Sequence, residues 1–593
     1  MTDILTQNPS NREMERLKQE RVEILSLPPE SALNRILNSS QPVILIHSFS
    51  DEDFYFLIRE IGVEDSLELL SMASDRQWEF ILDVELWKKD RIRQSTAVHW
   101  IDLILKADPN RLLRWSLNEK TEFIEWFLFK NIEIKIREHD QDPGIFGDEY
   151  ITFDDIYYIR IIPISEELRS EEDDDALRKE TLTRLLTRLA NFDHLQYQKL
   201  LLEASHILPA ESEEELFRLR NVRMAEKGFF PFDEAMQIYS PLKSEDLKNV
   251  SLKYPGGTRP DSMLPVPLSH IRALQEENLF TRSLEKIPTQ EVLIQIQTEF
   301  ASLCNQIISA DMKTIRHRAE LKGIVKKACG YLTIGLEQLD TRAHKNPDPN
   351  RTAALVSRYP LSDIFRVGFG EAMALKWQAE RWRTSAWFQK HGLGLTFWGE
   401  NGLGVLGGLF IKKPLFFDNH KTGVLYRDFT SVDELAQTKQ MLEDIIRIDH
   451  LLSLVNIDPS AYSALDFFTF KNFILTSWAK NHLNPNARST GENRFVPLEL
   501  DEFHELFLGM WEMKDGGRRV RKEIKESFLT WLANRTGLSS KEILTGVGYT
   551  LEALFNEAES EYQEVSADDL DPRFIHLFLI RGKHLSETAD CMQ

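Results

Sequence analysis

The chain has 593 residues, and 94 acidic against 72 basic residues give a formal net charge of -22. A chain of this length predicts several sections rather than one hydrophobic core. Nucleic-acid binding depends on clustered Lys and Arg, so the acidic excess argues against a nucleic-acid partner. Apolar residues make up 42% of the chain, which is enough to build substantial cores.

The three cysteines, Cys304, Cys329 and Cys591, lie far apart and form no CxxC pair. This usage predicts neither a zinc ribbon nor a disulfide framework and is typical of a reducing cytosol. The polar N-terminus lacks the apolar segment of a signal peptide. No run of about 18 apolar residues predicts a membrane span. We therefore expect a cytoplasmic protein without membrane insertion.

The first sections in chain order are a polar lead-in, residues 1–22, and a helical array, residues 23–130. The segment SDEDFYFLIREIG illustrates the array, with Ser50 as N-cap, acids in the first turn, an apolar face and Gly62 as the stop. Short amphipathic helices of this kind follow one another. They predict an array in which each helix buries one face against its neighbours.

A weak repeat supports the array. The apolar residues that precede the predicted cap Ser74 recur 34 residues later, before the predicted cap Asp108. A period of this length is typical of stacked helix pairs. The tetratricopeptide signature is absent, so we predict a generic helical array.

Composition divides the remainder into further sections. Alternating and β-branched residues around an Asp/Pro/Gly loop predict one β patch, and two glycines with four prolines in KYPGGTRPDSMLPVPLSH predict a linker. The sequence thus predicts a mainly α fold with two small β patches. The sections after the array are a small β patch (131–165), a helical section (166–250), a Pro/Gly linker (251–270), a helical section (271–390), a Gly-rich β patch (391–430) and a helical C-terminal section (431–593).

The segment GENGLGVLGGLFIKKP, residues 399–414, holds five glycines within ten residues. A phosphate loop requires a lysine directly after the last glycine and then a hydroxyl, and this segment has neither. The dinucleotide pattern GxGxxG matches at Gly402, Gly404 and Gly407. However, that pattern belongs in a strand-turn-helix unit, whereas the residues after these glycines resemble a strand containing a proline.

Two interpretations of the glycines remain open. They permit close backbone packing in a strand, or they line a ligand site. In the second case the two lysines predict an anionic ligand, and His391 is near enough in sequence to take part. The candidate ligand-binding residues are Trp398, Glu400, Gly402, Gly404, Gly407, Gly408, Lys412, Lys413 and Arg427.

No motif predicts catalytic residues, a metal site or a cofactor. None of the 15 histidines forms HExxH or a comparable pair. The GxSxG motif is absent, and no cysteine has a histidine nearby in the sequence. Cys304 and Cys329 fall in predicted helices, where we expect core residues.

Several phrases together resemble a bacterial family known only as a domain of unknown function. They are SMASDRQWEFILDVELWKKDR, MAEKGFFPFDEAMQIY, YPLSDIFRVGFGEA, and GENGLGVLGGLFIKKPLFFDN followed by TGVLYRDF. The resemblance spans nearly the whole chain. It implies no activity, cofactor or site residues.

The leading hypothesis is a cytoplasmic, non-enzymatic scaffold or adaptor, because helical arrays present long surfaces for protein partners. It predicts a groove of partner size. The alternative is an enzyme or ligand sensor with an anionic-ligand site around residues 391–427. The oligomeric state does not follow from the sequence.

Overall fold

The chain is mainly α with small antiparallel β patches, as predicted. It divides into two compact units, which we call unit 1 (Met1–Arg366) and unit 2 (Val367–Gln593). The predicted linker lies mostly outside the described residues, as does Cys591. The computed structural model describes residues 9–88, 90–162, 175–205, 209–249, 268–272, 274, 276–313, 315–341, 346–465, 467–484, 493–514 and 517–581.

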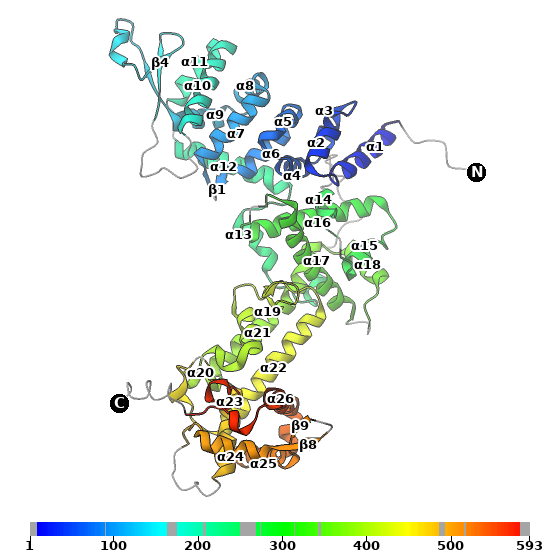
Figure 1. Ribbon diagram of the computed structural model, residues 1–593. Helices are drawn as coiled ribbons and strands as arrows, with labels where there is room; N and C mark the ends of the chain where they lie inside the picture. Colours follow the sequence, from blue (N-terminus) through cyan, green and yellow to red (C-terminus); the bar gives the residue numbers. More distant parts are fainter. Residues whose placement is uncertain are drawn as a thin grey trace, which may run out of the picture. The chain divides into compact units, whose positions relative to one another are not determined.

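The first half of unit 1 is a series of short helices, of which α2–α9 fall in the predicted array (23–130) and α10–α12 in the predicted helical section (166–250) (Figure 1). Neighbouring pairs bury their apolar faces against each other, with α4 on α6, α5 on α7, α7 on α10 and α9 on α11. The helices are α1 (Pro9–Ile24), α2 (Pro29–Leu37), α3 (Pro42–Ser48), α4 (Asp51–Ile61), α5 (Leu67–Met72), α6 (Asp75–Glu85), α7 (Gln94–Ala107), α8 (Pro109–Asn118), α9 (Thr121–Asn131), α10 (Asp175–Phe192), α11 (His194–Ala204) and α12 (Pro209–Glu226).

The predicted helix ends in this array are confirmed. The Ser50 side chain accepts a hydrogen bond from the backbone of Asp53, and Gly62 ends α4 with a φ of 110°. Ser74 forms a complete capping box on α6. Asp108 caps α8, so the two caps of the 34-residue repeat open equivalent helices.

The polar lead-in contains a helix that the sequence did not predict. Residues 1–8 lie outside the described part, but helix α1 starts at Pro9. The segment is rich in Glu, Arg, Lys, Met and Leu, which favour helix. Its end packs on α2 and α3 and buries Ile24. Tertiary contacts therefore stabilise a helix that has too little apolar surface to be recognised by its pattern.

The predicted β patch between α9 and α10 is also present. Strand β3 (Ile132–Ile136) pairs antiparallel with β5 (Tyr157–Ile161), which also pairs with β4 (Ile151–Thr152). A second, unpredicted hairpin joins β1 (Trp87–Lys88) to β2 (Arg91–Ile92). Two residues per strand are too few for an alternating pattern to be recognised.

The second half of unit 1 is helical. The long helices α16 and α17 pack on each other, and α15 packs on both α17 and α18. Among the helices of the described residues, none combines the length and the apolar character needed to cross a membrane. The helices are α13 (Phe232–Ala235), α14 (Leu268–Arg272), α15 (Leu279–Leu284), α16 (Gln290–Ala310), α17 (Arg318–Thr341), α18 (Pro349–Arg358) and α19 (Leu361–Ser385), the last of which continues into unit 2.

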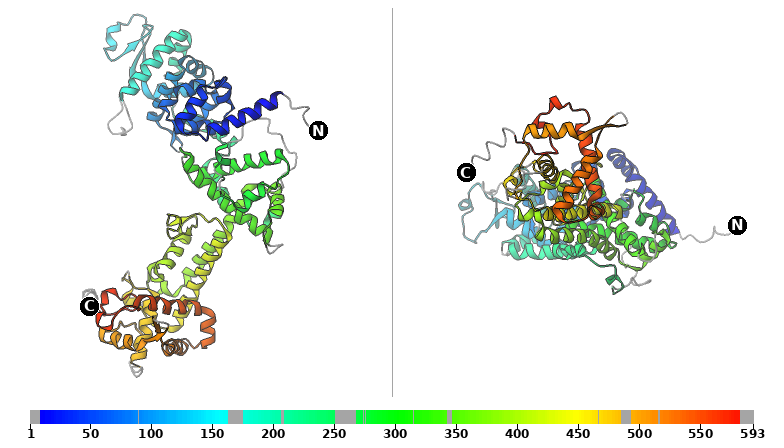
Figure 2. Two further views of the ribbon diagram at one scale, coloured as in Figure 1. Left: turned by 45° about the vertical axis from the view of Figure 1, so that its right-hand side comes forward. Right: turned by 90° about the horizontal axis from the view of Figure 1, so that it is seen from below.

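Unit 2 is built around the long helix α22, which packs on α20, α21, α25 and α26 (Figures 1 and 2). The hairpin predicted at PLFFDNHKTGVLYRDF is present as β6 and β7, and β8 and β9 add an unpredicted one. The elements are α20 (Trp387–Lys390), α21 (Gly399–Phe410), β6 (Phe416–Phe417), β7 (Tyr426–Arg427), α22 (Val432–Val455), α23 (Phe470–Leu483), α24 (Leu500–Met510), β8 (Trp511–Lys514), β9 (Gly517–Val520), α25 (Lys522–Thr536) and α26 (Ser540–Tyr562).

The carboxyl groups of Glu125 on α9 and Glu203 on α11 lie close together. We therefore expect the stability of the chain to depend on pH. Burial, and next the hydrogen bond with Glu203, raise the pKa of Glu125 to about 7. Because the pKa of Glu125 is higher in the folded state, its protonated carboxyl group contributes to stability. This contribution is complete below about pH 4 and is lost as the pH rises through about 7. We expect Glu125→Gln to stabilise the chain at pH 8 by about 1 kcal/mol, a value reduced for solvent screening. Thermal unfolding at pH 4 and pH 8 measures the difference.

The matched control for this experiment is Glu215→Gln on α12. A hydrogen bond from Arg218 lowers the pKa of Glu215, so its replacement should not stabilise the chain at pH 8. Stabilisation by both variants would mean that any loss of negative charge helps this acidic chain. The raised pKa of Glu125 beside Glu203 would then not be the cause.

Candidate functional site

The Gly-rich segment is helix α21, which corrects the strand predicted there. Glycine disfavours helix by about 1 kcal/mol relative to alanine, so the local preference pointed away from helix. Tertiary packing overrides that preference. One face of α21 packs on α22 and another on β6, and the missing side chains allow both approaches.

The contacts at individual glycines show what the missing side chains make room for. A Cβ at Gly404 would collide with the ring of Phe417. At Gly408 it would lie 2.5 Å from the backbone oxygen of Leu415, and at Gly402 it would lie 2.7 Å from the Cβ of Trp398. These contacts support the packing interpretation of the glycines.

Gly407 and Arg427 also belong to this packed region. A Cβ at Gly407 would lie 2.7 Å from the hydroxyl of Tyr426 on β7. Arg427 pairs with Asp418 at 2.8 Å and with Glu434 at 2.7 Å. Burial opposes a rise in the pKa of Arg427, but its hydrogen bonds to both carboxylates outweigh burial and raise it. Arg427 therefore ties the hairpin to α22.

The other predicted ligand-binding residues do not converge. Trp398 is buried, with ring centroids of Phe388 and Phe470 at 5.6 and 5.8 Å. Glu400 and Lys412, near opposite ends of α21, are exposed, and Lys413 is half-buried. The cavities described below have other linings. An anionic-ligand site at residues 391–427, including His391, stays a prediction.

The largest cavity that we describe is a groove of about 740 Å³ in unit 1, which we call the aromatic groove. It lies among α4, α6, α12, α14, α16 and the chain segments that follow α6, α12 and α16. Its lining residues are Glu52, Tyr55, Phe56, Phe80, Val84, Trp87, Lys88, Asp90, Arg93, Phe217, Arg220, Asn221, Met224, Phe229, Phe230, Pro231, Phe232, His270, Asn305, Ile308, Ser309, Met312, Lys313 and Ile315.

Aromatic side chains form a large part of this groove. Phe80 contacts Tyr55 and Phe229, with centroid distances of 6.1 and 6.5 Å. Trp87 contacts Phe217 at 5.4 Å. The groove opens to solvent, since Phe232 is 40% exposed and Met312 is 70% exposed. Exposed apolar surface that adjoins a concave aromatic lining is typical of a binding site.

The buried end of the groove holds a polar network. Lys227 pairs with Asp51 at 2.7 Å and contacts Glu52 at 3.5 Å. The amide nitrogen of Asn305 donates to the backbone oxygen of Lys227 at 2.7 Å, which turns its Oδ1 toward Nε2 of His270 at 3.2 Å. In this arrangement Nε2 of His270 donates to Oδ1 of Asn305. The network ties α4, α14, α16 and the chain after α12 together.

Burial sets the charge states in this network. It raises the pKa of Glu52 against the opposing charge of Lys227. It lowers the pKa of His270, which keeps the imidazole neutral near pH 7. Ser269 donates its hydroxyl to Asp53 and not to His270. The serine, histidine and aspartate are thus not arranged as a nucleophile with its general base.

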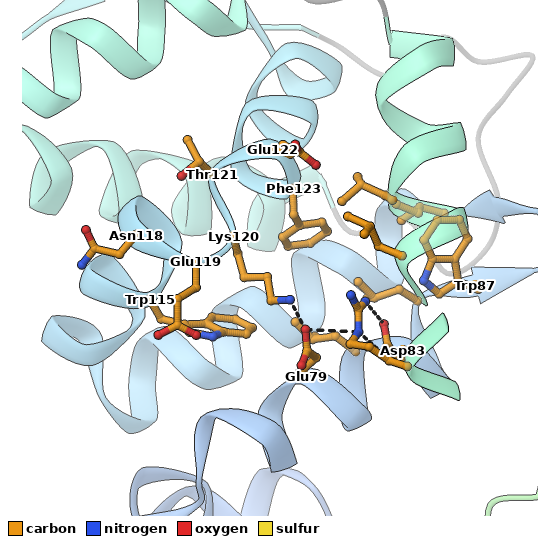
Figure 3. A pocket seen from close by; sticks show the side chains of 16 residues that line it. Glu79, Asp83, Trp87, Trp115, Asn118, Glu119, Lys120, Thr121, Glu122 and Phe123 are labelled. Carbon is orange, nitrogen blue, oxygen red and sulfur yellow. Dashed lines mark hydrogen bonds and ion pairs between the residues drawn. The ribbon is translucent and has the colours of Figure 1, made fainter. Parts of the chain in front are cut away.

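A second cavity, of about 340 Å³, lies against another face of α12 (Figure 3). Figure 3 shows Lys120 pointing toward Glu79, its ion-pair partner. Arg223 contacts Glu79 at 3.1 Å and Asp83 at 2.8 Å. The cations and carboxylates in the middle of this cavity therefore neutralise one another and hold α12 on α6.

Cys304 and Cys329 are core residues, as predicted, with 0% and 6% exposure. Burial raises the pKa of the Cys329 thiol to about 12 and also raises that of Cys304. Thiols of this kind are poor nucleophiles. Within the described ranges, no group of three or more His, Cys, Asp or Glu side chains is placed to hold a metal ion.

Sequence reasoning missed the aromatic groove because its lining comes from segments as distant as Glu52 and Ile315. One local signal was available. The stretch GFFPF, residues 228–232, places three phenylalanines beside a proline outside a regular amphipathic pattern. Phenylalanines in such a stretch have no helix face to bury them.

The fold and the cavity together define a mainly α-helical protein with an aromatic groove in unit 1. The chain belongs to a family of unknown function (DUF6178), which it matches over residues 9–581. This match confirms the resemblance to a domain of unknown function. Comparisons with curated proteins and with solved structures find no match.

Proposed function

We propose that the protein is a cytoplasmic, non-enzymatic scaffold or adaptor that binds a protein partner in the aromatic groove. The observation that carries this proposal is the aromatic lining of a groove in unit 1 that opens to solvent at Phe232 and Met312. Protein interfaces concentrate their binding energy in buried aromatic anchors and pockets. Phe232 and Met312 are the exposed apolar residues that a partner would cover.

The polar groups beside the groove favour binding over catalysis. Lys227 is satisfied by Asp51 and Glu52, and Asp53 accepts from Ser269. These pairs join separate helices. They rigidify the wall of the groove, and a rigid wall loses less conformational entropy when a partner binds.

Photo-crosslinking tests the proposal. We expect a benzophenone amino acid at Met312 to form one discrete adduct in cells that produce the chain, because a bound partner covers this position. Mass spectrometry should map the adduct to one segment of one partner. Phe232→Asp should abolish it, because a buried carboxylate in the groove opposes apolar docking.

The control is the same crosslinker at Leu195 on α11, which is 77% exposed and lies outside the groove lining. It should give no discrete adduct. Adducts of equal yield at both positions, or an adduct at Met312 that survives Phe232→Asp, would argue against a partner in the groove.

A further inference from the structure

The aromatic groove carries positive charge on a strongly acidic chain. Lys88, Arg93 and Lys313 line it, and within the described part of the chain none of the three forms an ion pair. Lys88 and Lys313 are exposed, and Arg93 is half-buried. Elsewhere in unit 1 many cations have carboxylate partners, such as Arg223 with Asp83. Unpaired cations are the expected complement of an anionic partner.

The carboxylates in the lining do not cancel this charge. Glu52 is held by Lys227 at 3.5 Å, at the buried end. Asp90 is the other carboxylate of the lining. Arg220 also lines the groove, but the carboxylate of Asp83 offsets its charge, and its Nε donates to the backbone oxygen of Asp83 at 2.7 Å. Lys88, Arg93 and Lys313 therefore outnumber Asp90, the remaining carboxylate of the lining.

We propose that the partner segment is an amphipathic α-helix with an apolar face and acidic flanks. This inference rests on the proposed function. The apolar face contacts the aromatic lining, and the acidic flanks pair with Lys88, Arg93 and Lys313. A helix satisfies its own backbone hydrogen bonds, which suits a groove lined by side chains of α4, α6, α12 and α16.

Designed peptides provide the test. One peptide of about 18 residues has Leu and Phe at the spacing i, i+3, i+4, i+7 and Glu on both flanks, and its counterpart has Gln in place of every Glu. Fluorescence anisotropy with the full chain measures both affinities. We expect the Glu peptide to bind about tenfold tighter at low salt, since three ion pairs at exposed or half-buried cations, of about 0.5 kcal/mol each, give that factor. The difference should shrink to about threefold or less at 0.5 M salt.

Charge reversal at Lys313 tests whether the preference for the Glu peptide arises in the aromatic groove. Lys313→Glu should weaken the Glu peptide about fivefold and leave the Gln peptide within about twofold, because an exposed attraction becomes a repulsion. Lys322→Glu on α17 is the matched control. It reverses an exposed cation of the same unit outside the groove lining and should change neither affinity.

The outcomes separate this inference from the proposed function. Equal binding of both peptides, or binding of neither, overturns the acidic helix. The crosslinking at Met312 decides independently whether a partner occupies the groove. A salt-sensitive dimer in sedimentation that Lys313→Glu abolishes would assign the groove to a second copy of the chain, which also overturns this inference.

Discussion

Replacing Gly408 by valine is expected to lower the free energy of unfolding of unit 2 by about 3 kcal/mol. A Cβ at this position lies 2.5 Å from the backbone oxygen of Leu415. That backbone cannot easily retreat, because the amide of Leu415 donates to the oxygen of Gly408 at 2.9 Å. Denaturant unfolding of the full chain, with hydrogen exchange reporting on α21, measures the loss.

A glycine without close neighbours is the control. Gly546 lies in α26, and a Cβ there has no other atom within 4 Å. Gly546→Ala is expected to stabilise unit 2 by about 0.5–1 kcal/mol, because alanine favours helix. If Gly408→Val unfolds like the wild type, the packing interpretation of the Gly-rich segment is wrong. The ligand interpretation would then regain support.

Replacing Asp449 by leucine is expected to cost unit 2 about 3 kcal/mol or more. Asp449 is 5% exposed, and its carboxylate accepts from the indole of Trp382 at 3.1 Å and from the amides of Trp387 and Phe388, each at 3.0 Å. Leucine leaves these donors without a partner, at about 1–3 kcal/mol for each buried group. Denaturant unfolding measures the loss, and quenched tryptophan fluorescence follows the local change.

A graded series distinguishes the lost acceptor from a lost charge. Asp449→Asn keeps one carbonyl oxygen and nearly the same volume, so it should cost clearly less than Asp449→Leu. Burial raises the pKa of Asp449, which shows that its charge is not favoured there. Equal losses for the two variants would contradict the role of Asp449 as an acceptor.

The helix ends show what was predictable from sequence. The helices begin or end at the predicted residues Ser50, Gly62, Ser74 and Asp108. Such ends are predictable because a cap is a contact between residues at most a few positions apart. The helical class and the β patch after α9 were predictable for the same reason. Both depend on local periodicity.

The Gly-rich segment shows where local reasoning failed. Its five glycines disfavour helix, yet residues 399–410 form α21. The decisive contacts come from Phe417, Tyr426 and Ile445, which follow the segment in sequence and approach it only in the fold. A preference of about 1 kcal/mol per glycine is smaller than the gain from packing a helix on two neighbours.

The sequence by itself determined the class of fold, the helix caps and the acidic surface, because each follows from neighbouring residues or from composition. Only the tertiary structure decided that the glycines of α21 meet protein side chains and that a groove brings Glu52 near Ile315. It also placed Lys88, Arg93 and Lys313 around one aromatic cavity. Such positions depend on contacts between residues far apart in the chain, and local spacing carries no information about them.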